Sequence, residues 1–392
     1  MSDSNRVQVS IVEEPTWGTT PHSAFLELPI VSGSFSEGQN VIRSAQLRSD
    51  AQLAGSKRVG VAPEASLEFE LQGDNHDLLL RAMLRNASGN DWSTAANIAG
   101  TGISAANGDN SFNGSSGMNT NVTIGQWVYV AGFLTAANNG WFKVVSATAT
   151  KMVVEGGTLS TEAAGNSITI KGSFIRNGTD VPSFSLQEEY LDLSSKLMLM
   201  KGAVISSAGL KISAGAIMTA SLQLEGRRVS QETTLAGNGS VTAAQANDVI
   251  ADTAGFDGLW IDDAKITTYY LTDISIALSA RPRFQRGLGQ LQTTGVKLGP
   301  LEVTGSFECY LDDTTSALRA KLLGNTAISL GFAITDGTHL YHFDLPKVYL
   351  TAEPGALPGN DADIMLAFDF NAEPVLLVAG GATKTIQICR VG

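Results

Sequence analysis

The chain has 392 residues, 43% of them hydrophobic, and its acidic side chains outnumber the basic ones, so that the formal net charge is −12. No run of apolar residues is long enough to predict a membrane-spanning helix, and the polar start MSDSNRVQVSIVEE lacks the pattern of a secretory signal. We therefore expect a cytosolic protein with no membrane partner, and the acidic balance disfavours a protein that grips a phosphate backbone.

Stretches in which apolar and polar residues alternate recur along the chain and predict strands. The first is residues 6–14, and a clear example follows at residues 66–72, SLEFELQ. There Leu67 and Phe69 face one side of the strand, and the glutamates beside them face the other side. The same alternation continues to the C-terminal part of the chain, so antiparallel sheets with one buried face fit better than a parallel α/β sheet.

The first of two predicted helices covers residues 75–86, NHDLLLRAMLRN. Asp74 or Asn75 precedes the apolar positions and is the expected N-terminal cap, because Asp and Asn side chains accept hydrogen bonds from the free backbone N–H groups of a helix. The residues expected on the buried side are Leu79, Leu80, Met83 and Leu84.

The second predicted helix covers residues 313–325, DTTSALRAKLLGN, with Asp313 as its cap and Gly324 as its C-terminal stop. Its expected buried residues are Leu318, Leu322 and Leu323. Both helices are about three turns long, and each is expected to lie across the edge or face of a sheet.

Each helix follows a strand that contains Phe-Glu and a polar turn, and the elements before and after it correspond in order. This self-similarity predicts a tandem duplication of one β-rich domain. Copy one comprises residues 25–86 and 173–230, and copy two comprises residues 259–392. An N-terminal arm, residues 1–24, precedes copy one, and a polar linker, residues 231–258, joins the copies.

Copy one is interrupted by an insertion. Its first part, residues 87–121, is poor in large apolar side chains and is predicted to be an exposed loop. Its second part, residues 122–172, contains four short alternating stretches and turn signals at ANNG and EGG, which predict a small inserted β domain.

Motifs for catalysis or metal binding do not emerge from the sequence. Of the four histidines, His339 and His342 are three residues apart in a predicted strand and point to opposite faces, so they cannot share a metal ion. Cys309 and Cys389 lie among apolar neighbours and are expected to be buried thiols. No nucleophile–base grouping is evident, so we expect neither an enzyme nor a cofactor.

Several short motifs resemble the tail tube (major tail) proteins of long-tailed bacteriophages, in their duplicated-domain form. The N-terminal segment EEPTWGTTP precedes a strand, a polar loop and a strand–helix unit, as in that family. The C-terminal segment RPRFQRGLGQLQTTGVKLGPLEVTGSF also looks family-like. The matching residues are Glu13, Glu14, Thr16, Trp17, Gly18, Arg48, Ser49, Asp50, Phe69, Glu70 and Leu71.

The resemblance implies a mostly β fold with two tandem β-sandwich or half-barrel domains, each with one flanking helix, plus the small inserted β domain. In that family six such domains surround a lumen for double-stranded DNA, so three two-domain chains would complete a pseudo-sixfold ring. The implied partners are further copies of the chain, a tape-measure protein, tail tip and terminator proteins, and DNA that passes without specific binding. The implied location is the virion tail, assembled in the host cytoplasm, and the implied role is genome ejection. The inserted domain would decorate the outside of the tube.

An acidic lumen would repel the phosphates of DNA and let it slide. The candidate lumen-facing carboxylates are Glu68, Glu70, Glu302 and Glu308. Two polar loops, residues 40–60 and 281–297, are candidates for stacking one ring on an acidic surface of the next. Their basic residues are Arg43, Arg48, Lys57, Arg58, Arg281, Arg283, Arg286 and Lys297.

Two alternatives remain open on the sequence. One is another ring-forming component of a tail or secretion tube, which would share the fold and form single rings. The other is a glycan-binding β protein that uses Trp92, Trp127 and Trp141 of the insertion. A hydrolase is the weakest candidate.

Overall fold

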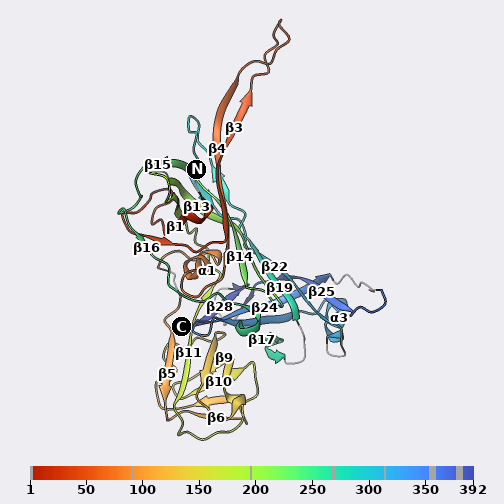
Figure 1. Cartoon of the computed structure of the whole chain (residues 1–392). Coiled ribbons are helices and arrows are strands. Elements are labelled where there is room, and N and C mark those ends of the chain that lie inside the picture. The colour runs from red at the N-terminus through yellow and green to blue at the C-terminus, as the bar shows by residue number, and fades with distance from the viewer. Residues whose placement is uncertain are drawn as a thin grey trace.

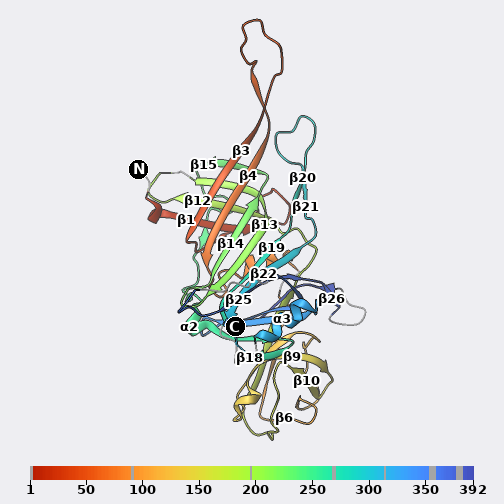
Figure 2. The same ribbon diagram turned by 90° about the vertical axis from the view of Figure 1, so that its right-hand side faces the viewer.

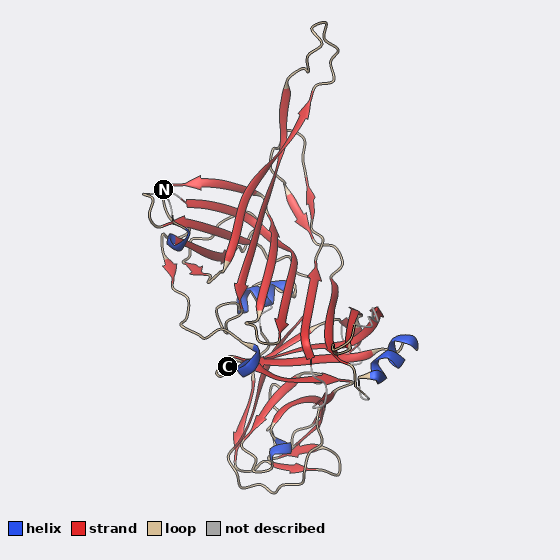
Figure 3. Ribbon diagram, turned by 45° about the vertical axis from the view of Figure 1, so that its right-hand side comes forward, coloured by secondary structure: helices blue, strands red, loops and turns tan. Residues whose placement is uncertain are grey.

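The computed structural model describes residues 3–89, 92–194, 197–266, 271–312, 315–352, 359–376 and 383–392. The described chain is mostly β, with few and short helices, so the expected fold class is confirmed (Figure 3). The molecule is elongated, with a long hairpin at one end and the inserted domain at the other (Figure 1). Among the described residues, no helix combines the length and apolarity needed to cross a bilayer.

Copy one is built on four antiparallel strands, in the order β3 (Ser32–Arg43), β4 (Ser56–Glu70), β14 (Thr219–Glu225) and β13 (Leu197–Ser213). Side chains along these strands point alternately to the two faces of the sheet. On β14 every second residue is buried, while Thr219, Ser221 and Gln223 are exposed. One face of this sheet therefore covers an apolar core, and the other face is polar.

The N-terminal arm expected at residues 1–24 is not free of the body. Strand β1 (Val7–Glu13) pairs along its whole length with β12 (Phe184–Tyr190), which in turn pairs with the first half of β13. Val9 and Ile11 are buried in the main core. These apolar side chains leave water only if the segment joins a sheet, which is why it lies against copy one.

Copy two repeats the arrangement with β19 (Leu271–Ser279), β22 (Glu302–Tyr310), β25 (Met365–Ala372) and β24 (Leu340–Ala352) in the same antiparallel order. Strands β17 (Phe256–Ile261) and β23 (Ile328–Thr335) take the places of β1 and β12.

Irregularities recur along with the strand pairings. β13 shifts register against β14 between Ile205 and Ser207, and β24 shifts register against β25 between Leu350 and Ala352. In copy one, the hydroxyls of Ser34 and Ser66 lie 2.6 Å apart, within the usual range of an O–H···O hydrogen bond. Its counterpart in copy two joins Ser275 and Ser306 at 2.9 Å. The two halves of the chain thus share one pattern of pairing down to single residues.

Helix α1 (Asp77–Met83) is shorter than expected, and its N-cap is His76, which makes no side-chain capping bond. The expectation that Asp74 or Asn75 caps the helix was wrong. Asp74 adopts φ 59° and its carboxylate faces His339 of copy two at 3.1 Å, so a tertiary contact has taken the group that a cap would use. The expected apolar residues of this helix are all buried.

Helix α3 (Ser316–Leu323) lies beside the sheet of copy two. The proposed cap Asp313 lies outside the described residues. Leu318 is buried, but Leu323 is 86% exposed, so its expected burial was wrong. The helix touches the sheet along one narrow side, and Leu323 points away from that side within the single chain.

The stretch 87–121 was expected to be an exposed loop, and this was wrong for much of its length. It contains β5 (Ala96–Gly100), β6 (Ser104–Ala106) and β7 (Ser111–Asn113), and Phe112 is fully buried. Small residues hid the strands from sequence inspection, because they pair with other strands instead of supplying a large apolar face of their own.

The rest of the insertion forms β8 (Trp127–Ala131), β9 (Gly140–Ala147), β10 (Lys151–Glu155) and β11 (Ile168–Arg176). Strand β11 pairs with β5 and β8, and β10 pairs with β7 and β9, so both parts of the insertion make one module. Hereafter "the module" denotes residues 93–172.

The remaining elements are short. They are η1 (Ser4–Arg6), β2 (Phe25–Glu27), η2 (Ala136–Asn138), β15 (Arg228–Glu232), β16 (Val241–Thr242), α2 (Asp252–Gly255), β18 (Ala264–Ile266), β20 (Arg283–Gln285), β21 (Gly295–Lys297), β26 (Val375–Leu376), β27 (Thr383–Lys384) and β28 (Gln387–Val391). β15, β16 and α2 lie in the expected linker 231–258 or at its start, so that segment is partly structured.

Candidate functional site

The sheets of the two copies join edge to edge. Strand β13 pairs with β19 from Ser207 opposite Ser279 to Ser213 opposite Asp273. This junction makes one continuous sheet from β3 to β24. Figure 2 shows its strands from β3 to β25 as neighbours. One face of that sheet covers the core, so the other face is a broad polar surface spanning both copies.

The polar face is lined by small and acidic residues. One row across the strands has only small side chains where it crosses the junction of the copies, between Glu68 at one end and Asn371 at the other. Its members, in strand order, are Glu68, Ser221, Gly209, Ala277, Thr304 and Asn371. Short hydroxyl, methyl and hydrogen side chains leave this surface even, and the carboxylates project from it.

All four carboxylates predicted to line a lumen lie on this face. On β4, Glu68 and Glu70 alternate with buried Phe69, and on β22, Glu302 and Glu308 alternate with buried residues. Glu68 and Glu308 occupy equivalent positions, because Glu68 pairs with Ser221 as Glu308 pairs with Ala367 in the corresponding strand. The structure thus brings together residues that are far apart in the sequence.

Further carboxylates on the same face were missed by sequence reasoning, namely Glu64, Glu225, Asp273 and Asp369. Glu64 of β4 lies directly opposite Glu225 of the neighbouring strand β14. Partial burial and the nearby Glu64 raise the pKa of Glu225 above its ordinary value. Each of these carboxylates alternates with buried apolar residues in its strand, and this pattern in the sequence could have identified them. Two basic groups offset part of this charge: Lys211 lies 3.0 Å from Asp273, and Arg281 pairs with Glu302.

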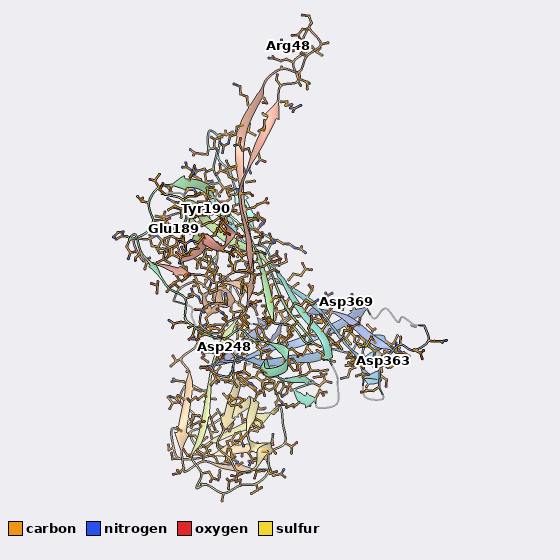
Figure 4. The ribbon with its side chains drawn as sticks, in the orientation of Figure 1. Arg48, Glu189, Tyr190, Asp248, Asp363 and Asp369 are labelled. Atoms are coloured by element: carbon orange, nitrogen blue, oxygen red, sulfur yellow. The ribbon has the colours of Figure 1, made fainter. Side chains whose placement is uncertain are left out.

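The two loops proposed for stacking are projecting hairpins that touch each other. The first, between β3 and β4, forms the long arm at the end of the molecule, with Arg48 near its tip (Figure 4). The second contains β20 and β21. Arg286 donates to the carbonyl of Val61 at 3.4 Å, and the N–H of Val61 donates to Leu291 at 3.2 Å. They therefore form one feature at the same end of the sheet.

Half of the basic residues of these hairpins are already engaged. Arg48 pairs with Asp50, and Arg58 lies 2.6 Å from Glu37. Arg281 and Arg286 make the contacts given above. Among the described residues, the basic side chains of the hairpins with neither an ion pair nor one of these hydrogen bonds are Arg43, Lys57, Arg283 and Lys297. Arg283 lies directly opposite Lys297, an arrangement of like charges that is unfavourable unless an anion lies nearby.

The hairpins also expose large aliphatic side chains. Leu47 and Leu288 are fully exposed at 102% and 104%, and Leu53 and Ile42 are 76% and 59% exposed. A two-stranded ribbon is marginal in water, and a cluster of this kind marks a contact surface.

The opposite end of the sheet is acidic in copy two. Tyr310 pairs with Met365, so the turn before β25 lies at the end of β22 that is farthest from the hairpin. Asp361 and Asp363 of that turn are exposed, and Figure 4 shows Asp363 far from the arm. The sheet therefore has a basic end and an acidic end.

Within the described residues, groups that would support metal or thiol chemistry are not assembled. No cluster of three or more potential metal ligands occurs there. Both cysteines are buried, and burial raises the pKa of Cys309 to about 12 and that of Cys389 well above its usual range. His342 is fully buried, and burial holds its pKa well below the ordinary value.

The tryptophans on which a glycan site would rest are not on the surface. Trp127 and Trp141 are 1% and 3% exposed and pack against copy two. Trp92 is half-buried under Arg390, whose guanidinium lies 4.4 Å from its ring centre. This removes the exposed aromatic platform that glycan binding would need.

Comparison with known proteins agrees with the sequence resemblance. No curated protein matches the chain. A family model described as phage tail tube protein matches residues 4–372, which include copy one, the module, the linker and most of copy two. This is a family of structural proteins of the phage tail. The chain belongs to the phage tail tube protein family.

Proposed function

We propose that three chains form a closed ring, that rings stack into the tail tube, and that the polar face of the continuous sheet lines the bore through which double-stranded DNA passes. The observation that carries this proposal is the β13–β19 junction, by which two equivalent domains stand side by side in one sheet. Repeating the same junction between chains extends the sheet around a ring, and two domains per chain make a pseudo-sixfold ring from three chains.

The chemistry of the face supports a conducting role. Duplex DNA carries one negative charge per about 1.7 Å, so a surface of carboxylates and small hydroxyls repels it and offers few donors to hold it. Glu68 and Glu308 recur at equivalent positions, so every sector of the ring would carry a carboxylate at that place. DNA, and before it a tape-measure protein, would move along this wall without specific binding.

Ring closure requires β3, whose outer edge has no partner among the described strands, to meet the copy two end of the next chain. Within the chain, Ser207 lies opposite Ser279. The register shifts of β13 and β24 correspond, so Ala352 of copy two is equivalent to Ser207 of copy one. The hydroxyl pairs of the two copies also correspond, so Gly38 of copy one is equivalent to Ser279 of copy two. We therefore expect Ala352 of one chain to lie opposite Gly38 of the next.

A cysteine pair tests this contact. Oxidation of Gly38→Cys/Ala352→Cys assembled from purified chains is expected to give covalent trimers on a non-reducing gel, since paired residues on adjacent strands bring their Cβ atoms within bridging range. The matched control, Ser207→Cys/Ser279→Cys, places both cysteines in one chain and is expected to stay monomeric. Monomers alone from the first variant, with the control bridged, would contradict ring closure by this junction.

The two ends of the sheet differ in charge, and this difference supports stacking of the rings. The basic, aliphatic hairpins of one ring would meet the acidic turn at Asp361 and Asp363 of the next, in a head-to-tail contact that repeats along the tube. Arg283 and Lys297 would there find the carboxylates that they lack in the single chain. Tail tip and terminator proteins would cover the two ends, in a virion tail assembled in the host cytoplasm.

Electron microscopy of the purified chain separates this function from the alternative ring-forming component. Long tubes with pseudo-sixfold cross-sections are expected. Single rings that never stack would favour the alternative, and the absence of rings would overturn the proposal.

A further inference from the structure

The module is part of copy one in the sequence, but it packs on copy two. It has a core of its own, which includes Phe112, Val128, Val130 and Phe142. A second, separate apolar cluster joins Trp127 and Trp141 of the module to Trp260, Ala333 and Cys389 of copy two. The module therefore has two apolar surfaces, one that holds it together and one that docks it.

The docking surface is centred on His342 of β24. Its ring lies 4.0 Å from that of Trp127, 4.8 Å from that of Trp260 and 5.4 Å from that of Trp141, measured between ring centres. Trp260 donates its indole N–H to the carbonyl of Gly156 in the module at 3.1 Å. Aromatic side chains from both bodies thus surround one imidazole and are buried together with it.

Polar contacts frame this aromatic centre. Lys143 of the module lies 2.9 Å from Asp263, whose other oxygen accepts a bond from Ser329 at 3.1 Å. Gln387 of β28 donates to the carbonyl of Gly125 at 2.8 Å. Lys143 is largely buried, and although burial opposes its charge, the carboxylates of Asp344 and Asp263 hold its pKa above the ordinary value.

A shared strand completes the contact. The first residues of β11 pair within the module, and its last four, Ser173–Arg176, pair with β28, which also pairs with β24 of copy two. The sheet of the module and the sheet of copy two are thereby connected through backbone hydrogen bonds. Figure 1 shows β11 running from the module toward β28.

The stem of the module is tied to copy one. The side-chain amide of Asn86, just after α1, donates to Arg176 at 2.8 Å, and the N–H of Gly178 donates to Leu84 at 2.7 Å. The segment that leads from α1 into the module and the segment that returns from it are thus held together at the end of α1. Copy one, the module and copy two form a closed triangle of contacts, whose third side is the β13–β19 junction.

We propose that the module is an internal bracket that fixes the angle between the two copies, so that the chain enters the ring with a set curvature. Sheet twist varies from one strand pair to another, so a strand junction by itself does not set one angle. The copies also touch directly, where Tyr341 donates to Asp77 at 2.7 Å and His339 lies 3.1 Å from Asp74. The module, docked beside these contacts and tied to both copies, adds a separate restraint on the angle. This role differs from the expected decoration of the tube exterior. Its effect on assembly rests on the proposed function, whereas docking itself is measured on the single chain.

The test separates docking from folding of the module. On β9, Trp141 and Lys143 point to copy two, and Phe142 and Val144 point into the module core. Trp141→Ser/Lys143→Glu is therefore expected to leave the module folded and to release it from copy two. Hydrogen exchange should retain protection in β8 and β10 and should lose at least tenfold protection in Ser173–Arg176, whereas the β28 amides that pair with β24 should stay protected. Ring yield in electron microscopy should fall at least tenfold.

A matched control changes exposed residues of the module. Leu134→Ser/Val145→Glu alters residues that are 83% and 43% exposed and is expected to preserve both protection and rings. Adding Asp263→Lys to Lys143→Glu alone restores an ion pair of reversed sign and should recover rings, which a misfolded chain would not do. Normal rings from the undocked variant would overturn the bracket. If wild-type chains form no rings, the proposed function fails, and the exchange data still decide docking.

Discussion

Asp344 of β24 shows how a single buried group can make this protein sensitive to pH. It is 1% exposed and accepts one bond, from Gln387 at 3.2 Å. Burial raises its pKa to about 7, although the charge of Lys143 opposes that shift. Because the folded state then binds the proton more tightly than the unfolded chain, this carboxyl costs stability as pH rises from about 4 to about 7.

Asp344→Asn removes that cost and is expected to raise the free energy of unfolding by about 1–4 kcal/mol at pH 8, with little change at pH 4. Denaturant unfolding at both pH values measures it. Asn also keeps the shape of the side chain, so a loss of stability at pH 8 would show that the ionised pair with Lys143 outweighs the burial of Asp344.

Glu14 gives a physical reason for the EEPTWGTTP motif. Its buried carboxylate accepts bonds from the N–H groups of Gly18 and Gly202, at 2.6 and 2.9 Å, and from the hydroxyls of Ser183 and Ser185, at 3.0 and 2.7 Å. One side chain thereby ties the segment after β1 to β12 and β13.

Glu14→Ala leaves these donors without an acceptor and is expected to lower the free energy of unfolding by about 3 kcal/mol. Chemical denaturation measures the change. Asp363→Ala, at an exposed carboxylate, is the control and should stay within about 0.5 kcal/mol of the wild type. Equal effects of both substitutions would refute the structural role of Glu14.

At the scale of elements, the hairpin between β3 and β4 is expected to serve assembly and to contribute little to the stability of the fold. Its tip is largely exposed, and its aliphatic side chains contact little of the body. Replacing residues 43–56 by Asn-Gly leaves Ile42 and Lys57 flanking a two-residue turn of a type that suits paired strands. Rings are expected to form, and tubes are expected to be lost.

Electron microscopy and sedimentation of the shortened chain report rings and tubes separately. Circular dichroism and thermal unfolding should match the wild type, because the removed residues lie outside the core. Tubes of normal length from the shortened chain would exclude this hairpin from stacking.

Helix positions illustrate which element features were predictable. The buried apolar residues of α1 were identified correctly, because four closely spaced leucine and methionine side chains leave water together only when the segment is helical. Its cap was not, because the carboxylate of Asp74 serves His339 from the other copy. In the same way, β5, β6 and β7 consist largely of small residues, and only their pairing partners make them strands.

At the scale of the whole molecule, the proposed bore predicts how charge affects transport. Glu68→Lys/Glu308→Lys changes equivalent positions on the polar face, so every sector of the ring gains positive charge. Folding and tube formation are expected to be retained, since both side chains lie outside the core. Purified tubes should gain DNA binding that weakens steeply with salt, measured by filter retention between 50 and 200 mM salt.

The control for this charge reversal is Lys151→Glu/Asp109→Lys, which inverts an ion pair on the module and should leave DNA binding absent. Charge-reversed tubes that bind no DNA would mean that this face does not line the bore.

The sequence alone determined the mostly β class, the repetition of elements, the family and the alternation that sets Glu68 and Glu308 apart from the core, because these depend on local periodicity and on short motifs. The tertiary structure alone decided that the copies share one sheet, that all four predicted carboxylates lie on one face, and that the module docks on copy two. Strand neighbours and docking partners depend on which surfaces leave water together, and residues such as Trp141 and His342 meet only after the chain has folded.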